Sequence, residues 1–437
     1  MTALDDITRR GQLATGFVAP RSGDVTIAAA GLERMRRLVD ALGNPQRAYR
    51  TIHVAGSKGK GSTVAYASAI LTATGRKTGR YTSPHLMDWR ERIAVDGVDI
   101  SHQDFDRVID YVDSTMKRLE AERPDDPPHN AFELLTAAAF VHFAEVGCEA
   151  AVIEVGIGGR FDSTNLVDAA VSVITAIEAE HLDILGPTMR DVAWNKAGIM
   201  RPGRPCVAVA QQPEVAAVLS AQSKVVGSDL VLQGRDWWTS GTSGSFVATT
   251  WSSEYADLTI SNPLPSQMTN AAASIVAVSL AIAPEQPTGE QMQAGLDAGS
   301  IPGRFEVIEG RPPVVLDVAH TADSIAVLGD GVRAAFAGRR IVLMVGILDD
   351  KDTALIATAV AGWADAVVAT TAPSPRGRAS SEIADALRET HTATIDRPSP
   401  SEAWTTAIQL AGDEGVVVGS GSFALVAHVR RIMFNRT

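Results

Sequence analysis

The chain has 437 residues, a length that predicts two or three domains. Hydrophobic residues make up 45% and charged residues 21%, so the chain can pack a core and is not a disordered protein. Its 51 acidic residues outnumber its 39 basic residues, and the net charge of −12 argues against a nucleic-acid-binding protein. The two cysteines, Cys148 and Cys206, exclude a disulfide scaffold and are expected to be free thiols. Without an apolar signal segment or membrane-length run, the chain is expected to be soluble and cytoplasmic.

The first half of the chain alternates apolar runs of strand length with longer helical stretches. Thr51–Ala55 is expected to be a strand, and Thr63–Thr74 the helix after it. Ala150–Val155 and Val171–Ile177 are expected to be buried strands, and Phe132–Glu145 a helix. This alternation predicts a mostly parallel sheet with helices on its faces.

Residues 233–262 differ in composition, being rich in Ser, Thr, Gly and Trp. Tyr255–Ile260 alternates with period two, which would place Ala256, Leu258 and Ile260 on one face. The segment is expected to form a small antiparallel region with one solvated face.

A second α/β series follows a Gly- and Pro-containing segment at Ala298–Arg311. The pattern predicts a smaller, Rossmann-like α/β domain and places the domains at residues 1–302 and 303–437. The expected strands are Val314–Leu316, Ile341–Val345, Ala366–Thr370 and Val416–Val418, and the expected helices include Ala322–Ala337 and Ser380–Glu389.

The most informative segment is IHVAGSKGKGST, which joins the first strand to its helix. Glycines in such a loop let backbone N–H groups surround a phosphate, and the following helix N-terminus favours negative charge. The variant pattern GxxGKGS separates Lys60 from the hydroxyl, unlike the usual GxxxxGK[ST]. Whether Lys58 contacts phosphate or faces water stays open. The expected phosphate-binding residues are Gly56, Ser57, Lys58, Gly59, Lys60, Gly61, Ser62 and Thr63.

Further motifs occur along most of the chain, namely YTSPHLMDWRERI, AFELLTAAAF, EVGIGGRFDSTN, HLDILG, NKAGIM, GRFEVI, DVAH and GSF. Together with the glycine-rich loop, they resemble the folylpolyglutamate synthase/dihydrofolate synthase family of the Mur ligase superfamily. The resemblance implies an N-terminal P-loop NTPase-like domain that binds ATP and a C-terminal glutamate-ligase domain.

The family's reaction begins when ATP phosphorylates an acceptor carboxylate to an acyl phosphate. The amine of L-glutamate then attacks, and phosphate leaves. ATP and the acceptor are both anions, so cations must neutralise their repulsion and the developing charge. The resemblance therefore implies ATP and two Mg²⁺ sites as cofactors, L-glutamate and a pterin or folate as substrates, and a monomeric enzyme.

The resemblance also implies the metal ligands. Ser62, Ser83 and Glu154 match positions near a first Mg²⁺, and His181 matches a ligand of a second. Lys196 matches a family lysine that is carbamylated, which would turn the cation into a metal-binding anion. An ordinary lysine on a helix face is the alternative.

Other matched positions would bind ATP or glutamate. Asn270, which is expected to begin an alanine-rich helix, matches a residue on the adenine side, although a simple helix cap is the alternative. Arg304 matches a phosphate-side residue. Arg92 matches a position at the glutamate substrate and suits a carboxylate because its fork is bidentate, although a surface pair with Asp88 or Glu91 is the alternative. Asp317 and His320 match the DxxH motif near the nucleotide and glutamate. The residues expected to act in catalysis are Lys60, Lys196, Asp317 and His320, and those expected at the substrate are Arg92, His320 and Ser422.

The sequence departs from the family pattern in three places. Lys58 stands where an asparagine is usual, Thr321 and Ala322 replace Asn and Pro after the DxxH motif, and Glu180 replaces an Asp before His181. Dihydrofolate synthase, folylpolyglutamate synthase and a bifunctional enzyme all stay open. A Mur-type ligase with another carboxylate acceptor, and a decayed ligase that only binds nucleotide, are the alternatives.

Overall fold

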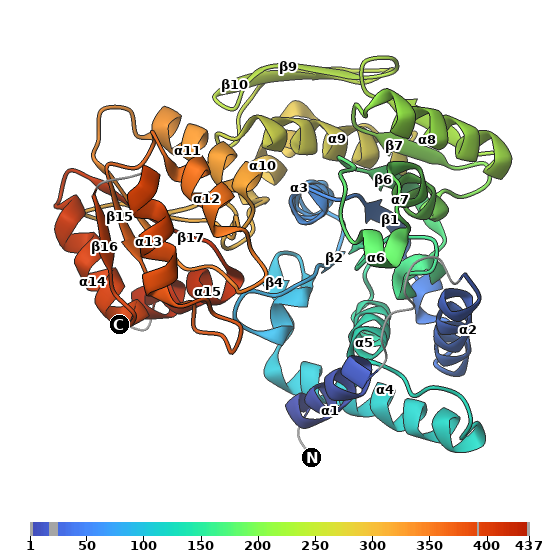
Figure 1. Ribbon diagram of the computed structural model, residues 1–437. Coiled ribbons are helices and arrows are strands. Elements are labelled where there is room, and N and C mark those ends of the chain that lie inside the picture. Colours follow the sequence, from blue (N-terminus) through green and yellow to red (C-terminus); the bar gives the residue numbers. More distant parts are fainter. Residues whose placement is uncertain (1–2, 17–24, 391–392, 435–437) are drawn as a thin grey trace. The chain divides into compact units, whose positions relative to one another are not determined.

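The computed structural model describes residues 3–16, 25–390 and 393–434. The chain divides into two compact units. The N-terminal unit contains Met1–Ile260 and Pro265–Gly299, and the C-terminal unit contains Ser261–Leu264 and Ser300–Thr437. The α/β class predicted from the sequence is confirmed in both units (Figure 1).

The N-terminal unit is built on an eight-stranded sheet, counted over the described residues. Six neighbouring strands are parallel, and a hairpin extends one edge in the antiparallel direction. In spatial order the strands are β4 (Val98–Asp99), β3 (Ile93–Val95), β2 (Thr78–Tyr81), β5 (Ala150–Glu154), β1 (Arg50–Ala55), β6 (Ala169–Ile174), β7 (Pro205–Ala208) and β8 (Asp229–Leu232).

Helices cover both faces of this sheet because its central strands are apolar on both sides. Ile52 and Val54 of β1 pack in one core cluster with residues of α3 (Lys60–Ala73), α9 (Pro265–Ala281) and α10 (Gly289–Ala298). The alternate residues of β5 face a second cluster. That cluster includes residues of α1 (Ala3–Gly16), α2 (Val25–Ala41), α4 (His102–Glu122) and α5 (Ala131–Glu145). A third cluster lies under α7 (Met189–Lys196) and α8 (Pro213–Val226).

Short elements complete the connections: α6 (Leu182–Leu185) and the 3₁₀ helices η1 (Pro45–Arg47), η2 (Trp89–Arg92), η3 (Ser163–Leu166) and η4 (Ala197–Ile199). Among the described residues, no helix is both long and apolar enough to cross a membrane. Cys148 and Cys206 are buried free thiols.

The predicted antiparallel region is the sheet of β9 (Trp238–Thr242), β10 (Ser245–Thr249) and β11 (Glu254–Leu258). The predicted face of its last strand is wrong at Ala256, which is exposed, whereas Leu258 and Ile260 are buried, as is Tyr255. Asp257 has a φ of 55°, and the β10–β11 register shifts here. This bulge breaks the period-two alternation on which the prediction relied.

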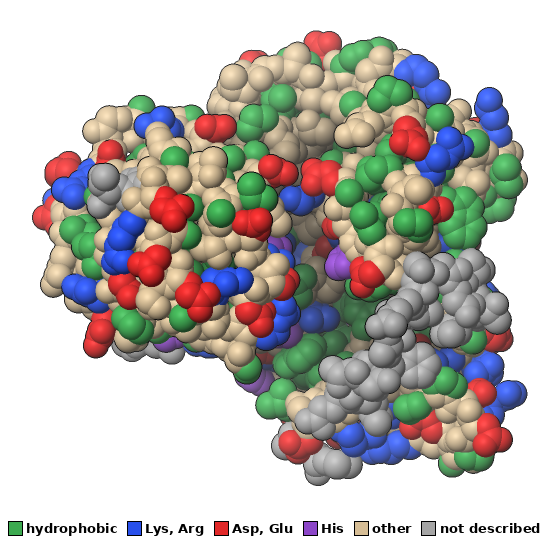
Figure 2. Space-filling view, in the orientation of Figure 1, with side chains coloured by type: hydrophobic (Ala, Val, Ile, Leu, Met, Phe, Trp, Pro, Cys, Tyr) green, Lys and Arg blue, Asp and Glu red, His purple; other side chains and the backbone are tan. Residues whose placement is uncertain are grey.

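The C-terminal unit has a six-stranded sheet within the described residues, in which only its first edge strand is antiparallel. Its strand order is β12 (Glu306–Ile308), β13 (Val314–Leu316), β17 (Val416–Ser420), β14 (Ile341–Val345), β15 (Ala366–Ala369) and β16 (Thr394–Asp396). Its helices are α11 (Ala322–Ala335), α12 (Thr353–Val360), α13 (Ser380–Thr390), α14 (Pro400–Ala411) and α15 (Phe423–Phe434). Acidic and basic side chains are interspersed on the face of this unit seen in Figure 2.

A buried ionic network fixes the segment that precedes α5. Arg10 of α1 is fully buried and donates to Asp113, at 2.5 Å, and to Glu120, at 2.7 Å. Glu120 also accepts from the His129 backbone N–H and bonds to its ring, and Arg10 donates to the His129 carbonyl. Arg34 of α2 donates to Glu133 in the first turn of α5. Three helices therefore hold the polypeptide at residues 129–133.

We predict that Glu120→Gln lowers the free energy of unfolding by about 2 kcal/mol at neutral pH, because hydrogen bonds to a charged group are lost around buried Arg10. Burial alone would raise the pKa of Glu120, but His129 and Arg10 outweigh it and lower the pKa from 4.5 to about 2. A lowered carboxyl pKa stabilises the fold above the unfolded value, and this contribution is lost as the pH falls through the folded value. The difference from wild type should therefore shrink between pH 4.5 and about 2.

Urea unfolding at a series of pH values measures this difference. Glu122→Gln is the control in the same helix, because Glu122 is exposed and pairs only at the surface with Arg118. Equal effects of the two substitutions would contradict the role of the buried network.

Candidate functional site

The phosphate loop, residues 56–63, lies between β1 and α3, at the carboxyl end of the parallel strands. Gly56 has a φ of 151°, and a Cβ there would lie 1.8 Å from Thr175 Oγ1. Gly59 has a φ of 89°, and its Cβ would lie 2.5 Å from Asn270 Oδ1. Both positions therefore require glycine for conformation and for space. The helix begins at Lys60, earlier than the predicted Thr63, so Ser62 and Thr63 lie in its first turn.

Two lysine side chains converge on one carbonyl of this loop. Lys60 Nζ lies 3.0 Å from the Gly56 oxygen and 3.3 Å from the Ser57 oxygen. Lys196 Nζ, from the end of α7, lies 2.8 Å from the same Gly56 oxygen and 2.9 Å from Glu180 Oε1. Lys196 is only 1% exposed, so it is not an ordinary lysine on a solvated helix face.

The electrostatics of Lys196 follow from this position. Burial lowers the pKa of its ammonium to about 8, with the positive charge of Lys60 adding to the effect and Glu180 opposing it. Burial alone would raise the pKa of Glu180, but the two lysines outweigh it and hold that pKa below its usual range. More of the Lys196 amine is therefore neutral near pH 7 than in an ordinary lysine.

Residues 176–180 are fastened to the phosphate loop. The Ser57 and Lys58 backbone N–H groups both donate to the Ala176 carbonyl. Ser57 Oγ donates to the Glu178 carbonyl and accepts from the Glu178 N–H. The Lys58 side chain is half-exposed and lies 3.6 Å from Glu178 Oε2, so Lys58 faces an acidic partner at the rim of the loop.

Glu154 ends β5, beside the last residues of β1, and is 4% exposed. Its Oε2 accepts a hydrogen bond from the Ser83 backbone N–H at 3.0 Å. The structure thus brings together two of the residues predicted near Mg²⁺. His181 directly precedes the short helix α6, has a φ of 48° and is exposed.

The segment after Ser83 is held rigidly by Glu91. The Glu91 carboxylate accepts from the backbone N–H groups of Leu86, Met87 and Asp88. Arg92 then lies over the Trp89 ring and donates through Nε to His85 Nδ1 at 3.0 Å. Burial and the neighbouring Arg92 charge lower the pKa of His85 to about 4, so His85 is neutral and accepts through Nδ1.

Asn270 is buried inside α9, whose first residue is Pro265, so the predicted helix start at Asn270 and the alternative of a helix cap are both wrong. The turn chemistry at Pro265 begins the helix earlier, because proline is well tolerated in a first helical turn. Asn270 instead lies against Gly59 of the phosphate loop. This contact joins residues far apart in the sequence.

The predicted residues of the C-terminal unit gather at the carboxyl ends of β13 and β17. Asp317 is buried and accepts from the Phe305 and Ala319 backbone N–H groups, both at 2.7 Å. Burial raises the pKa of Asp317, and Arg304 opposes this shift. The Arg304 guanidinium lies 5.3 Å from the centre of the Phe423 ring.

His320 and Ser422 lie in the same part of this unit. The His320 ring is 6.3 Å from that of Phe423, and its Nδ1 bonds to the Val318 carbonyl at 2.9 Å. Ser422 is buried, and its Oγ accepts from the Leu425 N–H, which caps the start of α15.

Sequence reasoning missed several residues that shape the site. The Glu91 carboxylate accepts backbone N–H groups, the Glu178 backbone bonds to the Ser57 hydroxyl, and Thr175 packs against Gly56. The spacing from Asp88 to Glu91 was a signal, because it is a capping-box pattern that the structure forms. The other contacts had no local signal.

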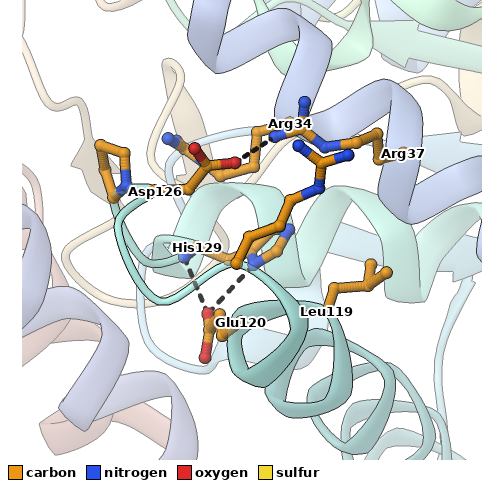
Figure 3. Close-up of a pocket in the computed structure, with 8 residues that line it drawn as sticks. Arg34, Arg37, Leu119, Glu120, Asp126 and His129 are labelled. Carbon is orange, nitrogen blue, oxygen red and sulfur yellow. Dashed lines mark hydrogen bonds and ion pairs between the residues drawn. The ribbon is translucent and has the colours of Figure 1, made fainter.

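A small cavity of about 20 Å³ lies elsewhere in the N-terminal unit, beside the ionic network (Figure 3). Two of its arginines already have partners, since Arg37 bonds to Asp126 and Arg34 to Glu133. Its volume is enough for about one water molecule, so it is not a substrate site.

Comparisons with known proteins identify the two domains and the relatives of this chain. Residues 54–278 match the Mur ligase middle domain, and residues 303–423 match the Mur ligase, glutamate ligase domain. The chain is 31% identical to the dihydrofolate synthase/folylpolyglutamate synthase of Bacillus subtilis, over 92% of this chain and 94% of that protein. It is 32% identical to the folylpolyglutamate synthase of Lacticaseibacillus casei, with the same two coverages.

Solved structures show the same fold over the whole length. Mycobacterium tuberculosis folylpolyglutamate synthase complexed with ADP has a TM-score of 0.86 and 30% identity, covering 100% of this chain and 99% of that one. E. coli FolC in complex with DHPP and ADP has a TM-score of 0.86 and 26% identity, covering 100% and 98%.

The phosphate loop and the two matched domains define an ATP-dependent ligase of the Mur type. Within that class, the chain belongs to the folylpolyglutamate synthase/dihydrofolate synthase family.

We predict that Gly59→Ala weakens ATP binding about tenfold or more, because the new Cβ would meet the Asn270 amide and distort the loop. Gly75→Ala is the matched control. Gly75 has nearly the same φ, 88°, but open space around it, so this variant should lose stability without losing ATP affinity. Calorimetric titration with ATP measures the ATP affinity of both variants, and equal affinities would contradict the prediction.

Proposed function

We propose that this ligase joins L-glutamate to the carboxylate of a folate-type acceptor after ATP has activated that carboxylate as an acyl phosphate. The glycine-rich loop with Lys60 at the end of β1 carries the proposal, because it supplies backbone donors and a cation where a triphosphate would bind. The full-length similarity to enzymes of both names supports dihydropteroate and reduced folates as the two acceptors to test.

The roles of the N-terminal residues follow from the same geometry. Residues 56–63 are proposed to surround the phosphates, and Asn270 to lie on the adenine side. Lys60 would stabilise the charge of the transferring phosphoryl group. The acceptor would bind along residues 81–93 and 129–133, and Arg92 would face the carboxylate of the glutamate substrate.

The donor atoms at the loop suit Mg²⁺. Ser62, Ser83 and Glu154 offer hard oxygen ligands, and Glu154 is a buried carboxylate beside the loop. The described residues contain no cluster of three His, Cys, Asp or Glu side chains that could hold a metal by itself. This suits Mg²⁺, which usually takes one or two carboxylates together with substrate phosphates and water. Bound there, Mg²⁺ would neutralise phosphate charge.

A second Mg²⁺ is proposed near His181 and Lys196, with Lys196 carbamylated. The neutral form of an amine is the one that adds CO₂, and the buried environment of Lys196 favours that form. The resulting carbamate would carry the negative charge that a metal ligand requires. Glu180, the present partner of Lys196, would then be released from that hydrogen bond.

The C-terminal unit is proposed to supply the glutamate side of the reaction. Residues 1–302 would form the ATP-binding domain and residues 303–437 the glutamate-ligase domain. Arg304 and Asp317 are proposed to contact the nucleotide, and His320 and Ser422 the glutamate. We also propose a monomer that works in the cytoplasm, where the two buried thiols would stay reduced.

The first test is a product assay by mass spectrometry with MgATP, L-glutamate and either dihydropteroate or tetrahydrofolate. We expect a product heavier by one glutamyl unit. A gain from dihydropteroate alone identifies dihydrofolate synthase, a gain from tetrahydrofolate alone identifies folylpolyglutamate synthase, and gains from both identify a bifunctional enzyme. No product from either acceptor, in a chain that binds ATP, would favour a Mur-type ligase with another carboxylate acceptor.

Lys60→Ala is the control for this assay. Its product should fall to background, and activity within about twofold of wild type would contradict the proposed phosphate role of Lys60.

Lys196→Ala should also inactivate the enzyme, because it removes the proposed carbamate, and added formate or acetate should restore part of the rate. Lys58→Ala is the matched control, since Lys58 is half-exposed in the same site, and the carboxylates should not accelerate it. A carbonyl signal that appears in the ¹³C NMR spectrum of wild type with ¹³C-bicarbonate, but not in Lys196→Ala, is an independent measurement. Full activity of Lys196→Ala without additives would disprove the carbamate.

A further inference from the structure

Three buried polar side chains form a hydrogen-bonded relay that connects β1 to the loop after β5. His53 and Thr164 are fully buried, and Asp162 is 8% exposed. His53 Nε2 lies 2.8 Å from Thr164 Oγ1, and Thr164 Oγ1 donates to Asp162 Oδ1. No step proposed above uses this relay.

The direction of each hydrogen bond can be worked out. Both Asp162 oxygens accept backbone N–H groups, Oδ1 from Thr164 at 3.0 Å and Oδ2 from Ile157 at 3.1 Å, so Asp162 acts as the acceptor. Burial raises the pKa of Asp162, and these hydrogen bonds oppose the shift. The single Thr164 hydroxyl proton goes to Asp162, and Thr164 Oγ1 must therefore accept from His53. His53 thus carries its proton on Nε2. Its buried Nδ1 has no partner among the described residues, and burial lowers its pKa well below the usual value.

The loop that this relay anchors runs between two proposed metal ligands, Glu154 and Lys196. It follows Glu154 directly and then packs on the end of α7, where the Arg160 N–H donates to the Asn195 carbonyl at 2.8 Å. A Cβ on Gly159 would lie 3.0 Å from the Asn195 backbone oxygen and 3.1 Å from the Lys196 backbone oxygen. The loop backbone therefore packs directly against Lys196.

The Asn165 side chain also holds this loop. Asn165 Nδ2 donates to the Arg160 carbonyl at 2.8 Å and to the Gly198 carbonyl at 3.1 Å. The anchor at Thr164 and the contact at Lys196 are therefore joined by a short, hydrogen-bonded backbone.

We infer that His53 and Thr164 are positioning residues that set the spacing between Glu154 and Lys196, and through it the Mg²⁺ affinity of the nucleotide site. The inference rests on the metal roles proposed for Glu154 and Lys196. His53 acts as a fixed neutral donor, and neither residue touches a substrate.

The test is the Mg²⁺ concentration that gives half-maximal enhancement of ATP binding, measured by calorimetry on the full chain. Thr164→Val keeps the shape but removes the relay, and His53→Leu removes the donor. We expect both to need about tenfold more Mg²⁺, which corresponds to about 1.4 kcal/mol. Thr164→Ser and His53→Gln retain the hydroxyl and an N–H donor, and should stay within about twofold of wild type.

Tyr255→Phe separates positioning from stability. It removes another buried hydrogen bond, from Tyr255 Oη to the Pro287 carbonyl, so its melting temperature should fall while its Mg²⁺ curve stays unchanged. If His53→Leu does not fold, the near-isosteric Thr164→Val carries the test alone.

If the Mg²⁺ curve of Thr164→Val coincides with that of wild type while its thermal stability falls, the inference is overturned. The hydrogen bonds of His53, Thr164 and Asp162 would then contribute only to the stability of the core. Binding is measured without acceptor or glutamate, so this result does not depend on turnover. Glutamate ligation by the same wild-type preparation is assayed separately, and failure of the proposed function is therefore distinguishable from failure of the positioning role.

Discussion

The Gly56 carbonyl is the point on which the nucleotide site depends. It accepts hydrogen bonds from Lys60 and Lys196 together, so two ammonium groups meet at one oxygen. At the reduced effective dielectric of a partly buried site, two ammonium groups that share one acceptor repel each other more strongly than they would in water. Glu180 offsets part of this repulsion, and the excess positive charge makes the loop favourable for a polyanion.

The surrounding sheet makes this convergence possible. Lys60 comes from the helix that follows β1, and Lys196 from a helix beyond β6, 140 residues from Gly56 along the chain. Parallel strands bring their carboxyl ends to one edge, and Glu154 of β5 reaches the same edge beside β1. The chemistry gathered there is thus a consequence of strand direction. Lys60 and Glu154 were recognisable from their places near strand ends, whereas Lys196, at the end of α7, was found only by the resemblance to the family.

What the sequence could and could not predict follows from the range of the interactions. The strands at Thr51–Ala55 and Ala150–Val155 were correct to within a residue, because a buried parallel strand leaves a local apolar run. The relay from His53 to Asp162 joins residues more than 100 positions apart and leaves no local pattern. The bulge at Asp257 was missed for a different reason. A single residue with positive φ changes which side chains of a strand point to the buried face, and it does so without changing the composition of the strand.

The departures from the family pattern are accommodated locally. The Lys58–Glu178 pair is half-exposed, and such pairs contribute at most about 1 kcal/mol. The shape of the loop is therefore set by the bonds of Ser57 and Ala176, which do not involve the Lys58 side chain. Glu180 is longer than the usual aspartate and reaches the Lys196 ammonium.

The change after the DxxH motif is the one feature that favoured a decayed ligase. In the structure, Thr321 is the N-cap of α11, and Thr321 Oγ1 and the Ser324 backbone N–H form the cap hydrogen bond. The His320 and Thr321 N–H groups both donate to Ser324 Oγ, so both backbone donors of this turn are bonded. Asn and Thr are both good caps, and replacing one by the other keeps the helix start that positions His320. Thr321 therefore lacks the side-chain amide of the usual asparagine but keeps the turn in place. The substitution gives the hypothesis of a decayed ligase no structural support.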